Sequence, residues 1–321
     1  MQVERLELAG FRSYPALVFE PSAGPQVLFG PNAAGKTNLL EALVVLARGA
    51  SHRAPETDLV GWGASLARLA ATVGHGPGRT SDAVEVALVR GEGAAVRKRL
   101  RVNGVPRRAT ALAGAFRIVL FAPEEMLLVV GPPSLRRGAL DAMAAARWPA
   151  YSRSLAIYGR TLAQRNALLR RIREGESSPD QLPFWDATLV EEGGRIVAWR
   201  QELLLALAGP LAAAAVEVAP GEGAVTLRYA TNAPAEPGEE PVEALRRRLA
   251  ATADKERWQG ATLVGPHRDD IVFELDGRPL AGFGSRGQQR SAILALKLAE
   301  LELLSGPEGE PPLLLLDDVF S

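Results

Sequence analysis

The chain contains 321 residues, of which 47% are apolar, with 37 acidic and 37 basic residues and no cysteine. Its length and apolar content allow a large buried core in two domains, or in one domain with a substantial insertion. The absence of cysteine excludes a disulfide framework and a cysteine-based metal site. Because the net charge is zero, any nucleic-acid binding would depend on local basic patches and not on an overall positive field.

The N-terminal residues 1–8 alternate charged and apolar side chains, so they lack the apolar core of a signal peptide. The sequence contains no run of about 18 uncharged apolar residues, which is the pattern that predicts a membrane span. We therefore expect a cytoplasmic protein without a membrane partner.

The first third of the chain has an α/β pattern, because short alternating or apolar runs are interrupted by one apolar helical segment. The predicted elements are a half-exposed strand at 6–8, a buried strand at 26–29, a helix at 37–47 and strands at 84–88 and 97–102. The last two strands form a plausible antiparallel hairpin, with its turn at 91–93 or at 102–104.

Leucine, alanine and arginine dominate from about residue 133 to residue 253, which predicts a helical insertion broken by polar stretches at 174–181 and 231–241. Strand patterns return later in the chain, at 261–264, 271–275 and 313–316. The predicted organisation is an N-terminal lobe at 1–130, a helical arm at 131–255 and a C-terminal part at 256–321.

Residues 30–37 follow the pattern G-x-x-x-x-G-K-T and come directly after an apolar run, which predicts a nucleoside triphosphate site. Gly30 and Gly35 let backbone N–H groups surround a phosphate, Lys36 reaches the β- and γ-phosphates, and the Thr37 hydroxyl can ligate Mg²⁺. We expect the nucleotide to be ATP. The predicted contacts in this loop are Gly30, Pro31, Asn32, Ala33, Ala34, Gly35, Lys36, Thr37 and Asn38.

The apolar run 313–316 ends in two carboxylates, Asp317 and Asp318. This is the Walker B pattern, in which the first carboxylate holds the Mg²⁺ shell and the second orients or deprotonates the attacking water. Alone, it is also typical of an ordinary strand that runs into a loop. Together with the phosphate-binding loop, it predicts Thr37 and Asp317 as metal ligands and Lys36 and Asp318 as catalytic residues.

Residues 285–290, Ser-Arg-Gly-Gln-Gln-Arg, begin a predicted helix that continues to residue 304. A small hydroxyl followed by glycine at a helix N-terminus is a second anion-binding arrangement. Since the phosphates already have a loop in the same subunit, this pattern indicates a nucleotide held between two subunits. Ser285, Gly287 and Gln288 of one subunit would then face the γ-phosphate that Lys36 of the other subunit binds.

Arginine supplies nearly all of the positive charge and occurs in clusters. Each cluster alone is more often a solvated face than a binding site, but together they favour an anionic partner. The candidate DNA contacts are Arg97, Lys98, Arg99, Arg107, Arg108, Arg136 and Arg137.

The order of these motifs is similar to that of the ABC-type ATPases of DNA repair and chromosome organisation, and in detail the chain resembles the RecF family. The segments that carry this resemblance are spread over the whole chain. They are residues 11–14, 30–38, 51–53, 121–125, 131–137 with Asp141, 164–169, 265–270, 285–290 and 316–321.

The resemblance implies an α/β fold with an ABC-type P-loop ATPase head and a helical arm inserted between Walker A and the signature motif. It also implies an ATP-dependent homodimer that binds double-stranded and gapped DNA and works with RecR and RecO to load RecA. The implied roles are DNA repair, replication, recombination and the SOS response, with weak DNA-dependent ATPase activity that serves as a switch. About 120 insertion residues without sustained heptads are too few for the long coiled coil of an SMC protein.

Two features depart from the family pattern. Ala33 stands where the family usually has glycine, so we expect a backbone φ that tolerates a Cβ atom and retained nucleotide binding. The family pattern also continues beyond Ser321. Among the histidines, His52 is a candidate sensor of ATP or DNA, while His267 either contacts the nucleotide or the partner subunit, or has a structural role.

Two other functions remain open at this point. A transporter-energising ABC subunit usually carries Leu-Ser-Gly-Gly-Gln, whereas this chain has Gly-Ser-Arg-Gly-Gln at 284–288 and a large arm. A structural chromosome-organising ATPase would share all the nucleotide motifs, and only its preference for DNA structures would distinguish it.

Overall fold

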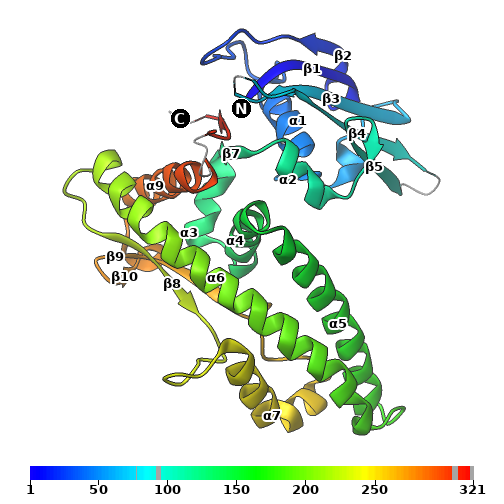
Figure 1. The fold of residues 1–321 in the computed structure, drawn as a ribbon, viewed down its shortest axis with the longest axis vertical. Coiled ribbons are helices and arrows are strands. Elements are labelled where there is room, and N and C mark those ends of the chain that lie inside the picture. The colour runs from blue at the N-terminus through cyan, green and yellow to red at the C-terminus, as the bar shows by residue number, and fades with distance from the viewer. Residues whose placement is uncertain (77, 92–94, 306–309, 319–321) are drawn as a thin grey trace. The chain divides into compact units, whose positions relative to one another are not determined.

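The computed structural model describes residues 1–76, 78–91, 95–305 and 310–318. The chain forms two compact units, which we call the head unit (Met1–Glu125 with Glu300–Ser321) and the central unit (Met126–Ala299). Figure 1 shows the elements of both. The first boundary lies near the one expected at residue 130, whereas residues 256–299, expected in the head, cluster with the central unit.

An antiparallel sheet of six strands, in the order β2-β1-β3-β4-β5-β6, forms most of the head unit. Its strands are β1 (Gln2–Phe11), β2 (Tyr14–Phe19), β3 (Leu66–Gly74), β4 (Asp82–Arg90), β5 (Val96–Val102) and β6 (Val105–Pro106). The predicted β4–β5 hairpin is confirmed, and the alternative turn predicted at 102–104 joins β5 to β6 and does not close this hairpin. Residues 92–94 of the first turn lie outside the described residues.

The helix α1 (Lys36–Arg48) contacts strands β3, β4 and β7, and its apolar residues from Leu39 to Ala47 are buried except for the half-buried Leu40. Strand β7 (Ile118–Phe121) pairs in parallel with β11 (Leu313–Leu316), which confirms the predicted strand before the two aspartates. The short helices of this region are η1 (Glu56–Asp58), η3 (Ala109–Ala111), α2 (Leu112–Ala115) and η4 (Pro123–Met126).

The predicted buried strand at 26–29 is wrong. These residues pair with no strand in the described part of the chain, and the side chains of Val27 and Phe29 are 82% and 92% exposed. An apolar run becomes a strand only where a neighbouring strand supplies hydrogen bonds to its N–H and C=O groups. The apolar pattern alone therefore gave the wrong element.

The central unit is mainly helical, as predicted for the insertion. Its elements are α3 (Leu127–Val130), α4 (Pro133–Arg147), α5 (Pro149–Arg173), η5 (Pro179–Gln181), α6 (Leu182–Val218), α7 (Pro241–Gln259), α8 (Leu280–Phe283) and α9 (Arg286–Leu304), with a sheet of β8 (Val225–Ala230), β9 (Asp270–Leu275) and β10 (Arg278–Pro279). Helices α5 and α6 form a hairpin that packs on α7 (Figure 1). At 1.5 Å per residue, α5 extends about 37 Å and α6 about 55 Å.

Two adjacent glycines bring α6 close to its neighbours. A Cβ atom on Gly193 would lie 2.7 Å from Leu245 and 3.0 Å from Tyr158, and one on Gly194 would lie 2.4 to 2.8 Å from Val242. Only a residue without a side chain allows this approach. The Gly-Gly pair inside α6 is therefore a packing feature of the arm.

The predicted strand at 261–264 is also wrong, because hydrogen bonds to side chains, and not to another strand, occupy its backbone N–H and C=O groups. Asn166 accepts a hydrogen bond from the Thr262 N–H (2.7 Å), and Glu256 accepts one from the Leu263 N–H (2.7 Å). The Asn232 amide donates to the Leu263 carbonyl (2.7 Å). These bonds hold an ordered loop between α7 and β9.

Of the helices that the structure describes, one segment, Pro179–Val218, is long and apolar enough by composition to cross a membrane. A third of its most apolar window is buried in the protein, and α6 packs on α5, α7 and β8. A core helix of a soluble protein has the same composition, so this segment is weak evidence for a membrane span.

Candidate nucleotide-binding site

The phosphate-binding loop connects to α1 through glycines in conformations that L-residues rarely adopt. Gly30 has φ 152° and Gly35 has φ 97°. A Cβ atom on Gly35 would lie 2.9 Å from the Tyr14 hydroxyl, which donates a hydrogen bond to the Gly35 carbonyl (3.1 Å). Tyr14, at the start of β2, thus packs directly on the loop.

Ala33 was expected to have a backbone φ that tolerates a Cβ atom. Its φ is 65°, in the left-handed region. A Cβ atom is tolerated there at a cost of about 1 kcal/mol. The loop therefore keeps a glycine-like geometry although the residue is alanine.

The side chains of Lys36 and Thr37 both contact other parts of the candidate site. The Lys36 ammonium donates to the carbonyl oxygens of Gly30 (2.8 Å) and Pro31 (2.9 Å) and so lies over the loop. The Thr37 hydroxyl donates to Asp317 Oδ1 (3.2 Å), 280 positions later in the chain. The structure thereby joins the loop motif to the carboxylate at the end of β11.

A threonine hydroxyl beside a carboxylate is a hard oxygen donor set that suits Mg²⁺. The described residues contain no cluster of three or more His, Cys, Asp or Glu side chains that could hold a metal ion. In a P-loop site Mg²⁺ takes few protein ligands and completes its shell with phosphate oxygens and water. Thr37 and Asp317 therefore fit the predicted metal site.

Asp318 follows directly, with an exposed side chain and φ 50°. The Asp317 N–H donates to the Phe121 carbonyl (2.8 Å) and extends the pairing of β11 with β7 by one residue. The backbone turns at Asp318, so the two carboxylates stand at the end of the strand. Residues 319–321 of the same motif lie outside the described residues.

A buried ion cluster that we did not predict lies beside the loop and is connected to it by hydrogen bonds. Glu41 of α1 is fully buried and accepts two hydrogen bonds from Arg12 (both 2.8 Å), one from Arg53 (2.9 Å) and one from the Ser51 hydroxyl (2.6 Å). Burial alone would raise the pKa of Glu41, but the bonds from Arg12, Arg53 and Ser51 together outweigh it and lower the pKa to about 2. The carboxylate is therefore charged at neutral pH.

The cluster reaches the loop through Asn38, whose side chain accepts from Arg53 (2.7 Å) and donates to the Ser13 hydroxyl (2.9 Å). In sequence, Arg12, Ser13 and Arg53 are recognisable only as family segments. A signal did exist, because a lone glutamate inside an otherwise apolar helix needs a cationic partner. The sequence could not say which arginines supply it.

His52 lies next to this cluster. Both of its ring nitrogens are buried and have no hydrogen-bond partner in the described part of the chain. Burial lowers the pKa of His52, so the imidazole is neutral at physiological pH. Its sensing role stays a prediction.

Ser285 begins α9, the predicted helix at 285–304, with a reciprocal capping arrangement. Its hydroxyl accepts from the Gln288 N–H (3.2 Å), and the Gln288 side chain accepts from the Ser285 N–H (2.9 Å). Ser285, Arg286 and Gly287 are exposed. The motif therefore places an accessible, capped N-terminus of a 19-residue helix on the surface of the central unit.

The predicted DNA contacts differ in whether their basic side chains are exposed or already paired with acidic side chains. Arg97 and Arg99 lie on one exposed face of β5 together with Arg101, which was not among the predicted contacts. Arg107 and Arg108 follow directly after β6, and all five side chains are exposed. None of these five has an ion pair with another described residue. Lys98 lies on the opposite face of β5, where it pairs with Glu56 and donates to the Gly49 carbonyl (2.8 Å).

Arg136 and Arg137 of α4 are bound inside the central unit. Arg136 forms a bidentate pair with Asp270 (2.7 and 2.9 Å) and donates to three backbone carbonyls. Arg137 donates to the Asp269 carbonyl (2.7 Å). Their guanidinium groups are thus occupied by protein acceptors.

The segment 265–270 belongs to the same internal network. His267 lies between the Tyr158 hydroxyl (Nδ1, 2.7 Å) and the Thr262 carbonyl (Nε2, 3.3 Å), and burial lowers its pKa to about 4. A carbonyl can only accept, so Nε2 carries the proton and the ring is neutral. Of the two roles considered for His267, these contacts favour the structural one.

Arg200 of α6 is the centre of a second buried network in this unit. It pairs with Asp141 (2.8 Å) and donates to the Pro266 carbonyl (2.8 Å) and to the hydroxyls of Tyr151 (3.2 Å) and Tyr229 (3.4 Å). The family segment 265–270 and the helices of the arm are therefore held together by charge-assisted hydrogen bonds.

Comparison with known proteins agrees with this geometry. A family model described as an AAA domain matches residues 5–113. The DNA replication and repair protein RecF of Symbiobacterium thermophilum is 41% identical over 331 aligned positions, which cover 100% of this chain and 85% of that protein. RecF of Herpetosiphon aurantiacus is 38% identical over 337 positions, which cover 100% of this chain and 86% of that protein.

Solved structures show the same fold. A structure of the recombination mediator protein RecF-ATP in the RecFOR pathway has a TM-score of 0.91 and 31% identity and covers 99% of this chain and 84% of that one. An Smc head bound to the C-winged helix domain of ScpA has a TM-score of 0.50 and 15% identity, covers 99% and 90%, and is similar in fold alone.

The phosphate-binding loop, the acid-terminated strand beside it and the capped Ser-Arg-Gly-Gln helix define an ABC-type P-loop ATPase head with a helical arm. Sequence identity of 38–41% over the whole chain establishes membership of the same family. The chain belongs to the RecF family of DNA replication and repair proteins.

Proposed function

We propose that this chain is an ATP-dependent DNA-binding recombination mediator that dimerises on ATP and binds double-stranded DNA at single-strand gaps and junctions. The observation that carries the proposal is the contact of Thr37 with Asp317, which assembles a nucleotide site from the two ends of the chain. The family's solved structures with ATP support ATP as the nucleotide.

Within one subunit, the loop N–H groups and Lys36 bind the phosphates. Lys36 needs only to turn from the carbonyls of Gly30 and Pro31 toward the β- and γ-phosphates. Bound Mg²⁺, held by Thr37 and Asp317, would neutralise phosphate charge. Asp318 stands one residue further, exposed, and positions the attacking water.

The second subunit contributes the N-terminus of α9. A helix N-terminus carries a partial positive charge and free N–H groups, so Ser285 and Gly287 can close over a γ-phosphate. Hydrolysis removes the phosphate that bridges the two subunits, and the dimer then loses affinity. Weak ATPase activity therefore works as a switch.

DNA binding is assigned to the five arginines on β5 and directly after β6 that form no ion pair with another described residue. Three of them, Arg97, Arg99 and Arg101, follow every second residue of one strand and so present a continuous row of charge. Such a row suits phosphate contacts, which carry no base sequence information. Arg136, Arg137 and Lys98 are left out, since their charges are already paired or hydrogen-bonded to the protein.

The proposed partners are RecR with RecO, and indirectly RecA, in the cytoplasm during gap repair, replication restart and the SOS response. A transporter-energising subunit is disfavoured by the identity to RecF proteins over the whole chain. A chromosome-organising ATPase would bind DNA without preferring gapped substrates.

The test is fluorescence anisotropy of gapped duplex DNA against uniform duplex, with and without ATP and Mg²⁺. We expect ATP to strengthen binding and the gapped duplex to be preferred. Ser285→Asp keeps the helix cap but adds a negative charge facing the phosphate, so it should remove the ATP effect. Ser285→Thr keeps both the cap and the hydroxyl and is the matched control. Equal binding with and without ATP would overturn the proposal.

A further inference from the structure

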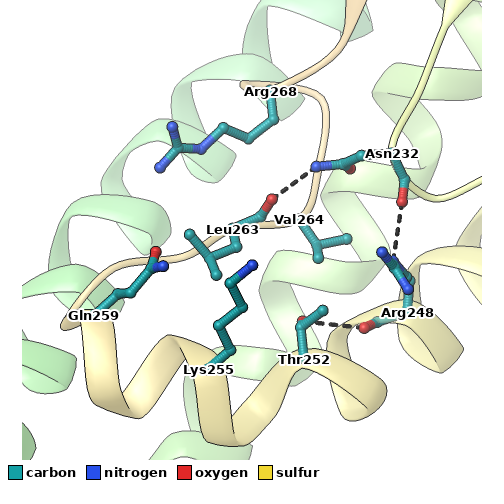
Figure 2. A pocket seen from close by; sticks show the side chains of 8 residues that line it. All are labelled: Asn232, Arg248, Thr252, Lys255, Gln259, Leu263, Val264 and Arg268. Atoms are coloured by element: carbon teal, nitrogen blue, oxygen red, sulfur yellow. Dashed lines mark hydrogen bonds between the residues drawn. The ribbon is translucent and has the colours of Figure 1, made fainter.

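The central unit contains a basic pocket that the nucleotide site does not use. It lies between α7 and the loop that precedes β9 and has a volume of about 310 Å³. Figure 2 shows Arg248, Lys255 and Arg268 around it, with Leu263 and Val264 on the loop side. We refer to it as the arm pocket.

One face of α7 and one ordered loop build this pocket. Arg248, Thr252, Lys255 and Gln259 recur at spacings of four, three and four residues, so they share a helix face. The loop residues opposite are fixed by the hydrogen bonds to Thr262 and Leu263 described above. The pocket is therefore preformed, which lowers the entropic cost of binding.

The charges in the arm pocket are not neutralised by acidic side chains. Arg248 and Arg268 donate to backbone carbonyls, of Asn232 (3.2 Å) and Thr262 (3.1 Å), and neither they nor Lys255 has an ion pair with another described residue. Among the described residues, no Asp or Glu lines the pocket.

The acids nearest in sequence to Lys255 and Arg268 are engaged elsewhere, and Asp269, which follows Arg268, is buried and accepts from the Tyr229 hydroxyl (2.7 Å). Glu256 is buried and pairs with Arg165 (2.7 Å), while Asp254 pairs with Arg257 on another face of α7. Three cations thus face one concavity without compensation, and their mutual repulsion would be relieved by an anionic ligand.

The chemistry of the ligand follows from the apolar side of the pocket. Leu263 and the largely buried Val264 line it, and Trp258, which is not part of the lining but precedes Gln259 on α7, is 78% exposed. Duplex phosphates are spread along an extended surface and would leave the apolar residues unused. An acidic peptide with interspersed apolar side chains matches both the cations and the apolar lining, and an exposed tryptophan is typical of a protein-binding surface.

We propose that the arm pocket docks an acidic, partly apolar segment of a partner protein. Binding here requires neither ATP nor dimerisation. A failure of this proposal can therefore be distinguished from a failure of the ATP-dependent clamp, because a Lys36→Arg variant should keep full peptide binding.

The experiment is fluorescence anisotropy with the full-length chain and a fluorescein-labelled peptide of alternating glutamate and leucine. The matching lysine–leucine peptide and a labelled gapped duplex are measured in parallel. Lys255→Glu should weaken binding of the acidic peptide by roughly tenfold or more, because it adds repulsion where a charge-assisted contact existed. Arg257→Glu makes the same charge change on another face of α7 and should alter binding by less than about twofold.

Arg248→Glu is a second pocket variant in case Lys255→Glu disturbs folding, which far-UV circular dichroism would show. Loss of acidic-peptide binding in both pocket variants, with the Arg257→Glu control unaffected, supports the proposal. No binding of the acidic peptide, equal losses in pocket and control variants, or loss of DNA binding with unchanged peptide binding would overturn it.

Discussion

Glu41 tests most directly whether the buried ion cluster stabilises the nucleotide site, and Glu41→Gln is the informative change. Glutamine has nearly the same shape but no charge to offset Arg12 and Arg53. Against the effect of burial, the hydrogen bonds from Arg12, Arg53 and Ser51 lower the pKa of Glu41 from 4.5 to about 2, which corresponds to roughly 3 kcal/mol. We expect Glu41→Gln to lower the free energy of unfolding of the head unit by about 3 kcal/mol at pH 7, within the range for breaking a buried pair.

The pH dependence has a definite sign. Because the folded-state pKa of Glu41 is depressed, its contribution is fully present above pH 4.5 and is lost as the pH falls toward 2. The difference between the native chain and Glu41→Gln should therefore shrink to about 1.4 kcal/mol at pH 3.

The assay is equilibrium urea unfolding at pH 7 and pH 3, followed by hydrogen exchange of the amides of α1. Glu20→Gln is the matched control, since Glu20 forms an exposed pair with Arg5 in the same unit and should contribute less than about 1 kcal/mol. A loss below about 1 kcal/mol for Glu41→Gln at pH 7, or an equal loss at both pH values, would refute this account of the cluster.

Three further changes test other features. Gly194→Ala places a Cβ atom 2.4 to 2.8 Å from Val242 of α7 and should lower the free energy of unfolding, measured with urea, by about 1–3 kcal/mol. A Cβ atom at Gly209 meets nothing within 4 Å, so Gly209→Ala should be neutral or stabilising. Equal effects of the two substitutions would contradict the packing argument. Ala33→Val puts a β-branched residue at φ 65° and should weaken ATP binding by about tenfold in calorimetry, while unchanged affinity would show that the loop relaxes. Arg99→Glu should weaken duplex binding and reduce the slope of log K against log salt concentration by the equivalent of about one phosphate contact. Arg246→Glu is the control, because Arg246 already pairs with Glu243 in the central unit. Identical behaviour of the two variants would argue against DNA binding by the β5 surface.

The candidate phosphate-binding loop could be recognised from sequence because its pattern depends on local spacing. Gly30, Gly35, Lys36 and Thr37 lie within eight residues of one another, the two glycines have positive φ, and Lys36 and Thr37 contact the loop and Asp317. The same holds for Ser285, whose capping partner is three residues away. The contact of Thr37 with Asp317 was inferred only because the two motifs are known to act together.

Features that need distant parts of the chain to meet could not be predicted. Strands at 26–29 and 261–264 failed because an apolar run does not reveal whether another strand will pair with it. The ion pairs of Glu41 could not be predicted because its partners, Arg12 and Arg53, come from two other segments of the chain. The period of β5 did contain one overlooked signal, since Lys98 falls on the face of buried Leu100 and not on that of Arg97 and Arg99.

The central claim, that ATP joins two subunits through the N-terminus of α9, is tested most directly by sedimentation velocity with and without ATP and Mg²⁺. We predict that the native chain shifts from its monomer mass of 34.1 kDa to twice that mass when ATP is added, and that Ser285→Arg stays monomeric. A native chain that remains monomeric at saturating ATP, or a Ser285→Arg variant that dimerises equally well, would contradict the account.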